Sequence, residues 1–146
     1  MSEAQASRPV QESRRGEYTL SDDPARLDLD EICRLLHDTY WAANRSRAQI
    51  ERAIHHSVCL GVYHRGRQVA FARAVTDRAT FAYLCDVIVA PDHRGIGLGS
   101  WLVESLLQHP DCQTLTQCLR TRDAHTLYER FGFVRTEYMR RSVNPF

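Results

Sequence analysis

The spacing of apolar and polar residues predicts most of the elements of this chain. Apolar side chains recur at helical intervals from Ile32 to Tyr40, which indicates an amphipathic helix over about residues 28–40. A second helix is predicted to begin after Ser46, because Ser46 and Gln49 form a capping-box pattern ahead of an apolar stripe. Runs of apolar and β-branched residues bounded by turn residues predict strands at 18–20, 58–64, 68–76, 80–89 and about 114–119.

The second half of the chain adds two helices and a last strand. The third helix is predicted to begin within a glycine-rich segment and to end at Pro110, since proline cannot continue a helix. A fourth helix over about residues 123–130 ends at Gly132, and a final strand or hairpin covers about 133–143. The order β-α-α-β-β-β-α-β-α-β indicates an α/β fold, with about six to seven strands in a mixed sheet, about four helices and one domain over residues 17–146.

Composition is that of a globular protein without a bias toward one class of partner. Of the 146 residues, 43% are hydrophobic and 25% are charged, and the formal net charge is +1. Nothing therefore favours a nucleic acid or a membrane surface as the partner, and no apolar run is long enough to span a bilayer. The polar segment 1–16 lacks the apolar core of a signal peptide and is predicted to be a flexible tail.

The number and spacing of the cysteines and histidines indicate the cellular compartment of the protein and whether it binds a metal. The five cysteines are odd in number and scattered, without a C-x-x-C pair, which predicts reduced thiols in a cytoplasmic protein. The seven histidines also lack the spacing of metal ligands. His55 and His56 are adjacent, so on a helix they point about 100° apart. We therefore expect no bound metal.

The segment Val87–Ser100, with the sequence VIVAPDHRGIGLGS, carries the strongest chemical signal. A buried strand leads into a turn and then into a loop in which every second residue is glycine. Gly95, Gly97 and Gly99 have no Cβ, so a ligand can approach their backbone closely. The N–H groups of the first helical turn, together with the charge of Arg94, favour an anion. We interpret this segment as a cradle for a pyrophosphate.

Other glycine motifs fit this segment less well. No Gly-Lys-Ser/Thr follows, so it is not the P-loop of nucleotide hydrolases. The spacing Gly-x-Gly-x-Gly also differs from the dinucleotide fingerprint, and too little chain follows for a second βαβ half. A glycine-rich turn without a ligand is the remaining alternative.

A second motif makes the interpretation specific. The pattern Val-x-Val-x-Pro-x-x-Arg-Gly-x-Gly-x-Gly begins at Val87, and Ala-x-x-Leu-Tyr-x-x-Phe-Gly-Phe begins at Ala124. Together these motifs resemble the GNAT superfamily of acyl-CoA-dependent N-acyltransferases, with a close match over about residues 80–134. The resemblance implies the GNAT fold and acetyl-CoA as co-substrate.

The resemblance also implies roles for individual residues. The pantetheine arm of coenzyme A would pair with a strand that splays from its neighbour, and the pyrophosphate would lie in the glycine loop. Tyr128 occupies the position of the family's tyrosine near the coenzyme sulfur, which implies a general acid. The residues implied to bind the coenzyme are Val87, Ile88, Val89, Arg94, Gly95, Ile96, Gly97, Leu98, Gly99 and Ser100.

Two positions depart from the family's pattern. Some polyamine-acetylating relatives carry Glu-Asp where this chain has Cys85-Asp86. Asp86 is a catalytic candidate that would act through a water or bind a cationic acceptor, and a structural anchor is the alternative. Thr121 stands where relatives often carry asparagine, so its contact with the pantetheine is a candidate only.

The acceptor is expected to contact the first helix, the loop after it and the ends of neighbouring strands. Asp77 and Asp86 favour a cationic amine, whereas Arg45 and Arg73 favour an acceptor that carries a carboxylate. The sequence leaves both open. The candidate acceptor-binding residues are Tyr40, Trp41 and Asp77.

The expected function is transfer of an acetyl group from acetyl-CoA to a primary amine of a small molecule, by direct attack in a ternary complex. Acetylation of peptides or proteins is one alternative, and a non-catalytic sensor module that binds coenzyme A is another. The predicted strand at 134–143 would have an unpaired edge, which predicts a homodimer.

Overall fold

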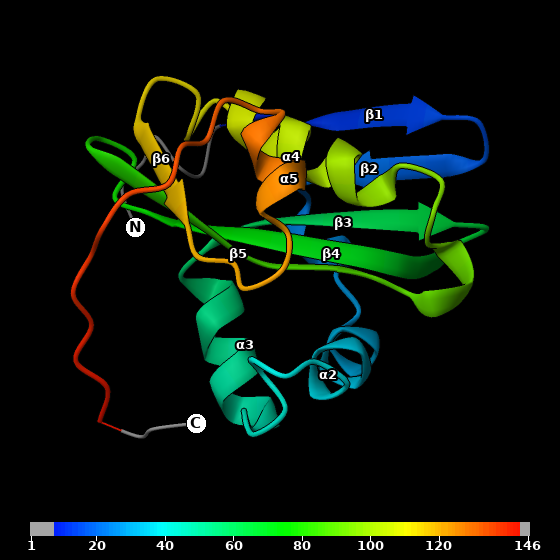
Figure 1. Ribbon diagram of the computed structural model, residues 1–146. Coiled ribbons are helices and arrows are strands. Elements are labelled where there is room, and N and C mark those ends of the chain that lie inside the picture. The colour runs from blue at the N-terminus through cyan, green and yellow to red at the C-terminus, as the bar shows by residue number, and fades with distance from the viewer. Residues whose placement is uncertain (1–7, 144–146) are drawn as a thin grey trace.

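The computed structural model describes residues 8–143, and one mixed sheet forms the centre of this part of the chain (Figure 1). Its six strands lie in sequence order, antiparallel from β1 to β5, and β6 pairs parallel to β5 after a helical crossover. The strands are β1 (Glu12–Arg15), β2 (Tyr18–Ser21), β3 (Val58–His64), β4 (Arg67–Thr76), β5 (Phe81–Val89) and β6 (Thr116–Leu119). The predicted mixed α/β sheet is confirmed.

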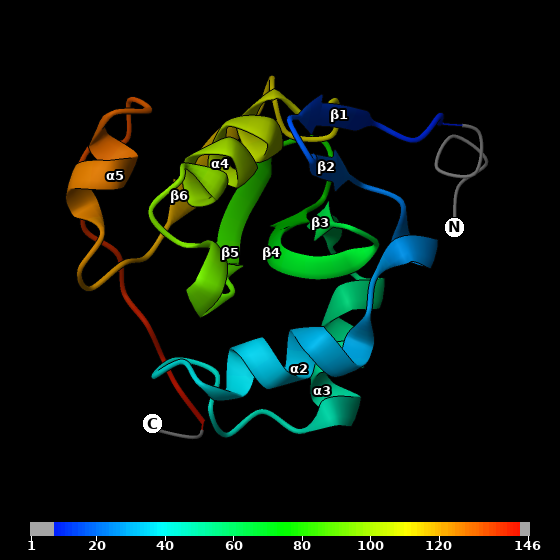
Figure 2. The ribbon, with the colours of Figure 1, turned by 90° about the vertical axis from the view of Figure 1, so that its right-hand side faces the viewer.

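Helices cover both faces of the sheet. Figures 1 and 2 show α2 and α3 on one face and α4 and α5 on the other. As predicted, Ser46 caps α3, because its hydroxyl accepts the N–H of Gln49 at 3.1 Å. Within residues 8–143, no helix is both long and apolar enough to cross a membrane. The α-helices are α2 (Leu29–His37), α3 (Arg47–His55), α4 (Leu98–Gln108) and α5 (His125–Glu129), with short 3-10 turns at Pro24–Arg26 and Pro91–His93.

The hydrophobic core lies on both faces of β4, whose middle is fully buried. Ala70 and Ala72 have no exposed surface, and their small side chains let a helix layer approach the sheet closely. Phe71 alternates with them, so its buried ring enters the opposite layer. The largest fully buried helix side chains are Ile32 and Leu36 of α2 and Leu102, Val103 and Leu106 of α4.

The structure corrects the prediction of a tail over residues 1–16. Its last part forms β1, which pairs with β2 across a turn where Gly16 has a φ of 60°. Every residue of β1 is exposed, so no apolar alternation marks this strand in the sequence. Asp22 fixes the hairpin by accepting the N–H of Gln11 at 2.7 Å. Residues 1–7 lie outside the described residues.

The final strand predicted at 133–143 is wrong. This segment contains no strand, and apart from the partly buried Phe133 its large apolar side chains are exposed: Val134 is 83% exposed and Met139 is 99% exposed. The predicted strand therefore has no partner within the described chain. The expected homodimer rested on this strand and stays a prediction without that support.

Candidate active site

The strands β5 and β6 separate halfway along β5. Their parallel pairing ends at Leu84 and Leu119, whereas β5 continues to Val89. Beyond Leu84, no strand of the described chain pairs with β5 on the β6 side. Backbone groups on such an edge can pair with an extended ligand. The residues predicted to bind pantetheine lie on this free segment: Val87, Ile88 and Val89.

A β-bulge interrupts the other edge of β5 at the same level. Phe71 of β4 pairs with Ile88, and Arg73 pairs with Cys85, so β5 has one more residue than β4 between these pairs. Asp86 occupies the bulge with a φ of 56°, in the left-handed region that residues other than glycine rarely adopt. The bulge re-aims the Asp86 side chain toward the layer of α2 and α3, where its partners lie.

The carboxylate of Asp86 is held by three donors. Trp41 Nε1 donates to Oδ1 at 2.9 Å. Arg45 Nη1 and Arg73 Nε donate to Oδ2 at 2.7 Å and 2.6 Å, and Arg73 also donates to Ser57 Oγ at 3.0 Å. These contacts join the α2–α3 loop, β4 and β5 at the point where β5 loses its β6 partner. We call Asp86, Arg45, Arg73 and Trp41 the Asp86 cluster.

The charges of this cluster set the pKa of Asp86. Burial alone would raise the pKa of the carboxyl, but the nearby charges of Arg73 and Arg45 and their hydrogen bonds outweigh it and lower the pKa below the ordinary value. Both oxygens accept hydrogen bonds, so the carboxylate is ionised but a poor proton acceptor. This geometry fits the anchor role better than that of a base, and the catalytic role of Asp86 stays a prediction.

Tyr128 approaches the same region from α5. Its ring lies edge-on to Phe133, with centroids 5.9 Å apart. Burial raises the pKa of the hydroxyl, and the nearby Asp123, Cys85 and Tyr40 raise it further. Tyr128 is therefore close to the bulged part of β5 and to the α2–α3 loop, and its hydroxyl holds its proton to a higher pH than an exposed tyrosine does.

The helix that carries Tyr128 is shorter than predicted. It covers His125–Glu129 rather than 123–130. Ahead of it, the hydroxyl of Thr121 accepts the N–H of Ala124 at 3.0 Å. Thr121 thus stabilises the turn that leads into α5. Its predicted contact with pantetheine stays a prediction.

The glycine loop between β5 and α4 has the predicted geometry of an exposed, uncapped helix start. Gly95 and Gly97 have φ values of 78° and 92°, where a residue with a Cβ would be strained. Gly97 is the N-cap residue of α4, and no side chain caps this end, so the first-turn N–H groups have no intrahelical partner. Arg94 Nε donates to the carbonyl of Val89 at 2.9 Å, which places its guanidinium at the end of β5.

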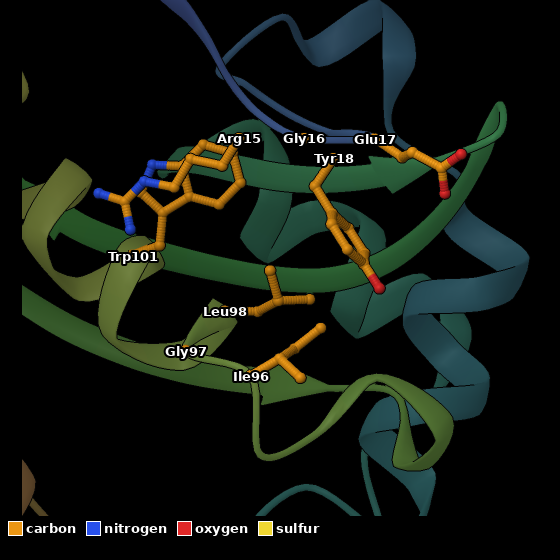
Figure 3. Close-up of a pocket in the computed structure, with 8 residues that line it drawn as sticks. All are labelled: Arg15, Gly16, Glu17, Tyr18, Ile96, Gly97, Leu98 and Trp101. Carbon is orange, nitrogen blue, oxygen red and sulfur yellow. The ribbon is translucent and has the colours of Figure 1, made fainter.

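A pocket of about 320 Å³ adjoins this loop on the side of the β1–β2 turn (Figure 3). The side chain of Trp101 forms part of its wall, and the guanidinium of Arg15 lies 4.9 Å from the centroid of the Trp101 ring. The lining residues are Arg15, Gly16, Glu17, Tyr18, Ile96, Gly97, Leu98 and Trp101. No sequence motif predicted this pocket, because β1 was not expected.

The structure brings two of the three candidate acceptor residues to the site. The predicted first helix ends at His37, so Tyr40 and Trp41 lie on the α2–α3 loop. Their rings are edge-on, with centroids 5.1 Å apart, and Trp41 is bonded to Asp86. Asp77 lies apart, in the β4–β5 turn, where it accepts hydrogen bonds from the backbone of residues 79–81. Its acceptor-binding role gains no support from this position.

Arg122 is a residue that sequence reasoning missed. Its guanidinium carbon lies 3.9 Å from the centroid of the Tyr40 ring, in a cation–π arrangement. It is far from Tyr40 in sequence and belongs to no motif, so only the fold brings the two together. Arg122 adds a third arginine beside the Asp86 cluster.

All five cysteines are free thiols in the described chain, and the reduced, cytoplasmic protein stays a prediction. Within residues 8–143, no three side chains of the metal-binding types are arranged to hold an ion. The expectation that the protein needs no metal stays a prediction.

Comparisons with known proteins agree with this geometry. The family model described as the acetyltransferase (GNAT) domain matches residues 55–135, which include the Asp86 bulge, the glycine loop and Tyr128. The chain belongs to the GNAT family of acetyltransferases. The resemblance inferred from the two motifs is confirmed, and so is the GNAT fold.

Solved structures and curated sequences support this GNAT assignment. The crystal structure of a candidate GNAT acetyltransferase from Xanthomonas campestris is 46% identical, with a TM-score of 0.82, over 86% of this chain and 93% of that chain. A candidate acetyltransferase from Gibberella zeae is 32% identical over 63% of this chain and 63% of that protein. An uncharacterized N-acetyltransferase, ycf52, from Porphyra purpurea is 27% identical over 74% of this chain and 64% of that protein. The chain thus spans less than two thirds of the length of these curated relatives.

Proposed function

We propose that this protein transfers the acetyl group of acetyl-CoA to a primary amine of a small molecule, by direct attack in a ternary complex. The observation that carries the proposal is the separation of β5 from β6 beyond Leu84, along the part of β5 that leads to the glycine loop. A thioester tail that follows the free edge of β5 from the loop would bring its sulfur toward Tyr128.

The residues around this free edge fit coenzyme A. The uncapped N–H groups at Leu98, Gly99 and Ser100, at the positive end of α4, suit a pyrophosphate. Arg94, next to Val89, adds a cation that matches phosphate. The free edge of β5 suits the two amides of pantetheine, which resemble an extended peptide. The chemistry that acetyl-CoA supplies is an activated acetyl group on a good leaving group.

The chain's residues would then promote each bond change. The amine nitrogen attacks the thioester carbonyl, and a backbone N–H of β5, which we assign to Val87, stabilises the negative oxygen that forms. As the carbon–sulfur bond breaks, the Tyr128 hydroxyl donates its proton to the departing thiolate. The proton lost by the attacking nitrogen leaves through water. Asp86 would contribute by fixing Arg45, Arg73 and Trp41.

The first experiment separates this proposal from its alternatives. Thermal shift with acetyl-CoA tests the cradle, and release of free thiol in the presence of an amine panel tests transfer. Stabilisation together with amine-dependent thiol release supports the proposal. A response to peptides alone would favour peptide acetylation, and binding without any transfer would favour a sensor module. Absence of acetyl-CoA binding would overturn all three.

A further inference from the structure

The charge at the proposed acceptor site is unbalanced. Asp86 contributes one negative charge and accepts from two guanidinium groups, Arg45 and Arg73. Arg45 uses one nitrogen for this ion pair, and its side chain is 26% exposed. One carboxylate between two arginines leaves a net positive charge, and the partly exposed Arg45 retains donors that a ligand can reach.

A third cation extends this charge toward the exposed side. Arg122 lies over the ring of Tyr40, which is edge-on to Trp41, and Trp41 is bonded to Asp86. Among the ion pairs of residues 8–143, none involves Arg122. Its guanidinium is exposed and is free to meet an anion beside the aromatic pair.

Neither Asp77 nor Asp123 balances this charge. The sequence suggested Asp77 as a partner for a cationic acceptor. In the structure, both of its carboxylate oxygens accept hydrogen bonds within the β4–β5 turn, and Thr80 Oγ1 donates to the second of them at 2.5 Å. Asp123 is exposed near Tyr128 and forms no ion pair among the described residues. Among the described residues, Asp86 is therefore the only carboxylate that forms an ion pair with Arg45, Arg73 or Arg122. Its single negative charge is already shared between Arg45 and Arg73.

We infer that the amine acceptor of this enzyme carries an oxyanion, a carboxylate or a phosphate ester, which Arg45 and Arg122 bind beside the Tyr40–Trp41 pair. The inference rests on the proposed acetyl transfer and names its substrate class. Planar guanidinium groups bind both oxyanions through paired N–H donors, so both sources share one recognition chemistry. A purely cationic diamine would face net repulsion at this position.

Matched pairs of amines test the inference. β-Alanine is compared with β-alaninamide, phosphoethanolamine with ethanolamine, and a short diamine serves as the cationic arm. Thiol release at saturating acetyl-CoA gives kcat/KM for each compound. We expect the anionic member of at least one pair to exceed its neutral partner by about tenfold or more, as a charge-assisted contact provides. The pair that responds distinguishes carboxylate from phosphate.

Variants connect this preference to the named residues. Arg45→Gln retains the Arg73–Asp86 ion pair, and Arg122→Gln changes an exposed side chain. Each is expected to raise KM for the anionic acceptor about tenfold while leaving KM for acetyl-CoA unchanged. Arg52→Gln, on the exposed surface of α3, is the matched control and should leave the preference intact. Thermal melts of all three variants verify folding.

The outcomes separate the two proposals. Equal or better turnover of the neutral or cationic members would overturn the inference and leave acetyl transfer standing. Binding of acetyl-CoA with no turnover of any amine would overturn acetyl transfer. In that case, calorimetry with propionate and inorganic phosphate on the CoA-bound protein decides the inference: binding that Arg45→Gln and Arg122→Gln weaken supports an oxyanion site, and absence of binding overturns it.

Discussion

Arg73 Nε lies 2.6 Å from Asp86 Oδ2, at the residue where β5 leaves regular strand geometry. A left-handed backbone conformation at an aspartate costs free energy, and here buried ion pairs compensate for it. The bulge and the cluster are therefore one structural unit. This unit stands beside the free edge of β5 that the proposed coenzyme would occupy.

Replacing the central carboxylate should destabilise the protein. Asp86→Asn retains the size of the side chain but leaves the two arginines without their counter-charge. We expect the free energy of unfolding to fall by about 2–4 kcal/mol, somewhat less than for a fully buried pair because Arg45 is partly exposed. Urea denaturation measures this loss. Glu51→Gln, on the surface of α3, is the control, and an equally stable Asp86→Asn would contradict the structure.

The same carboxylate should make stability depend on acidity. The pKa of Asp86 is lower in the folded protein than in the unfolded chain, so the unfolded state binds its proton first as pH falls. The stabilisation is fully present above the unfolded pKa of about 4 and is lost as pH falls through the folded pKa. The stability gap between wild type and Asp86→Asn should shrink from about pH 7 to about pH 3. A gap that widens over this range would refute the assignment.

Removing the Tyr128 hydroxyl should slow turnover and spare binding. In Tyr128→Phe the ring can retain its edge-on contact with Phe133, whereas the proton donor is lost. A thiolate is a weak base, so we expect kcat to fall by about 10²-fold, at the low end for general acids. Steady-state thiol release measures the change, and the affinity for acetyl-CoA should not change.

The pH profile provides a second measurement for Tyr128. Because burial raises the pKa of this hydroxyl, wild-type kcat should persist above the ordinary tyrosine pKa of 10.0 before its basic limb falls. Full kcat in Tyr128→Phe at saturating acceptor, with the same basic limb, would exclude the general-acid role.

A methyl group at Gly97 should weaken the coenzyme cradle. Gly97→Ala places a Cβ on a residue with φ of 92°, so the loop must shift or store strain of about 1–2 kcal/mol. The matched control is Gly66→Ala, in the β3–β4 turn, with φ of 78° and equally open surroundings. Both variants should lose stability, but only Gly97→Ala should weaken acetyl-CoA binding in calorimetry. Similar binding by both would argue against the cradle.

The sequence predicted those parts of the fold that local patterning controls. β3, β4 and β5 are mainly apolar, with every second residue of β5 buried, and α4 begins directly after Gly97 and ends two residues before Pro110. The strand β1 was missed because all four of its residues are exposed, and only backbone pairing with β2 defines it. The C-terminal segment shows the converse, since a strand was predicted there and none forms within the described residues.

The candidate site likewise has parts that the sequence predicted and parts that only the fold brings together. The glycine loop and Tyr128 belong to contiguous motifs, so the sequence alone was enough to predict them as candidates. The partners of Asp86 come from the α2–α3 loop and β4, and the bulge that joins them depends on a register shift that no local pattern encodes. Arg122 meets Tyr40 only in the folded chain.

The chain contains two tryptophans, and the fold assigns one to each half of the proposed site. Trp41 is bonded to Asp86 beside the acceptor region, and Trp101 lines the pocket at the glycine loop. Intrinsic fluorescence therefore has two built-in reporters. Trp41→Phe and Trp101→Phe would each leave a single emitter, so the order in which nucleotide thioester and amine enter could be followed optically without attaching a dye.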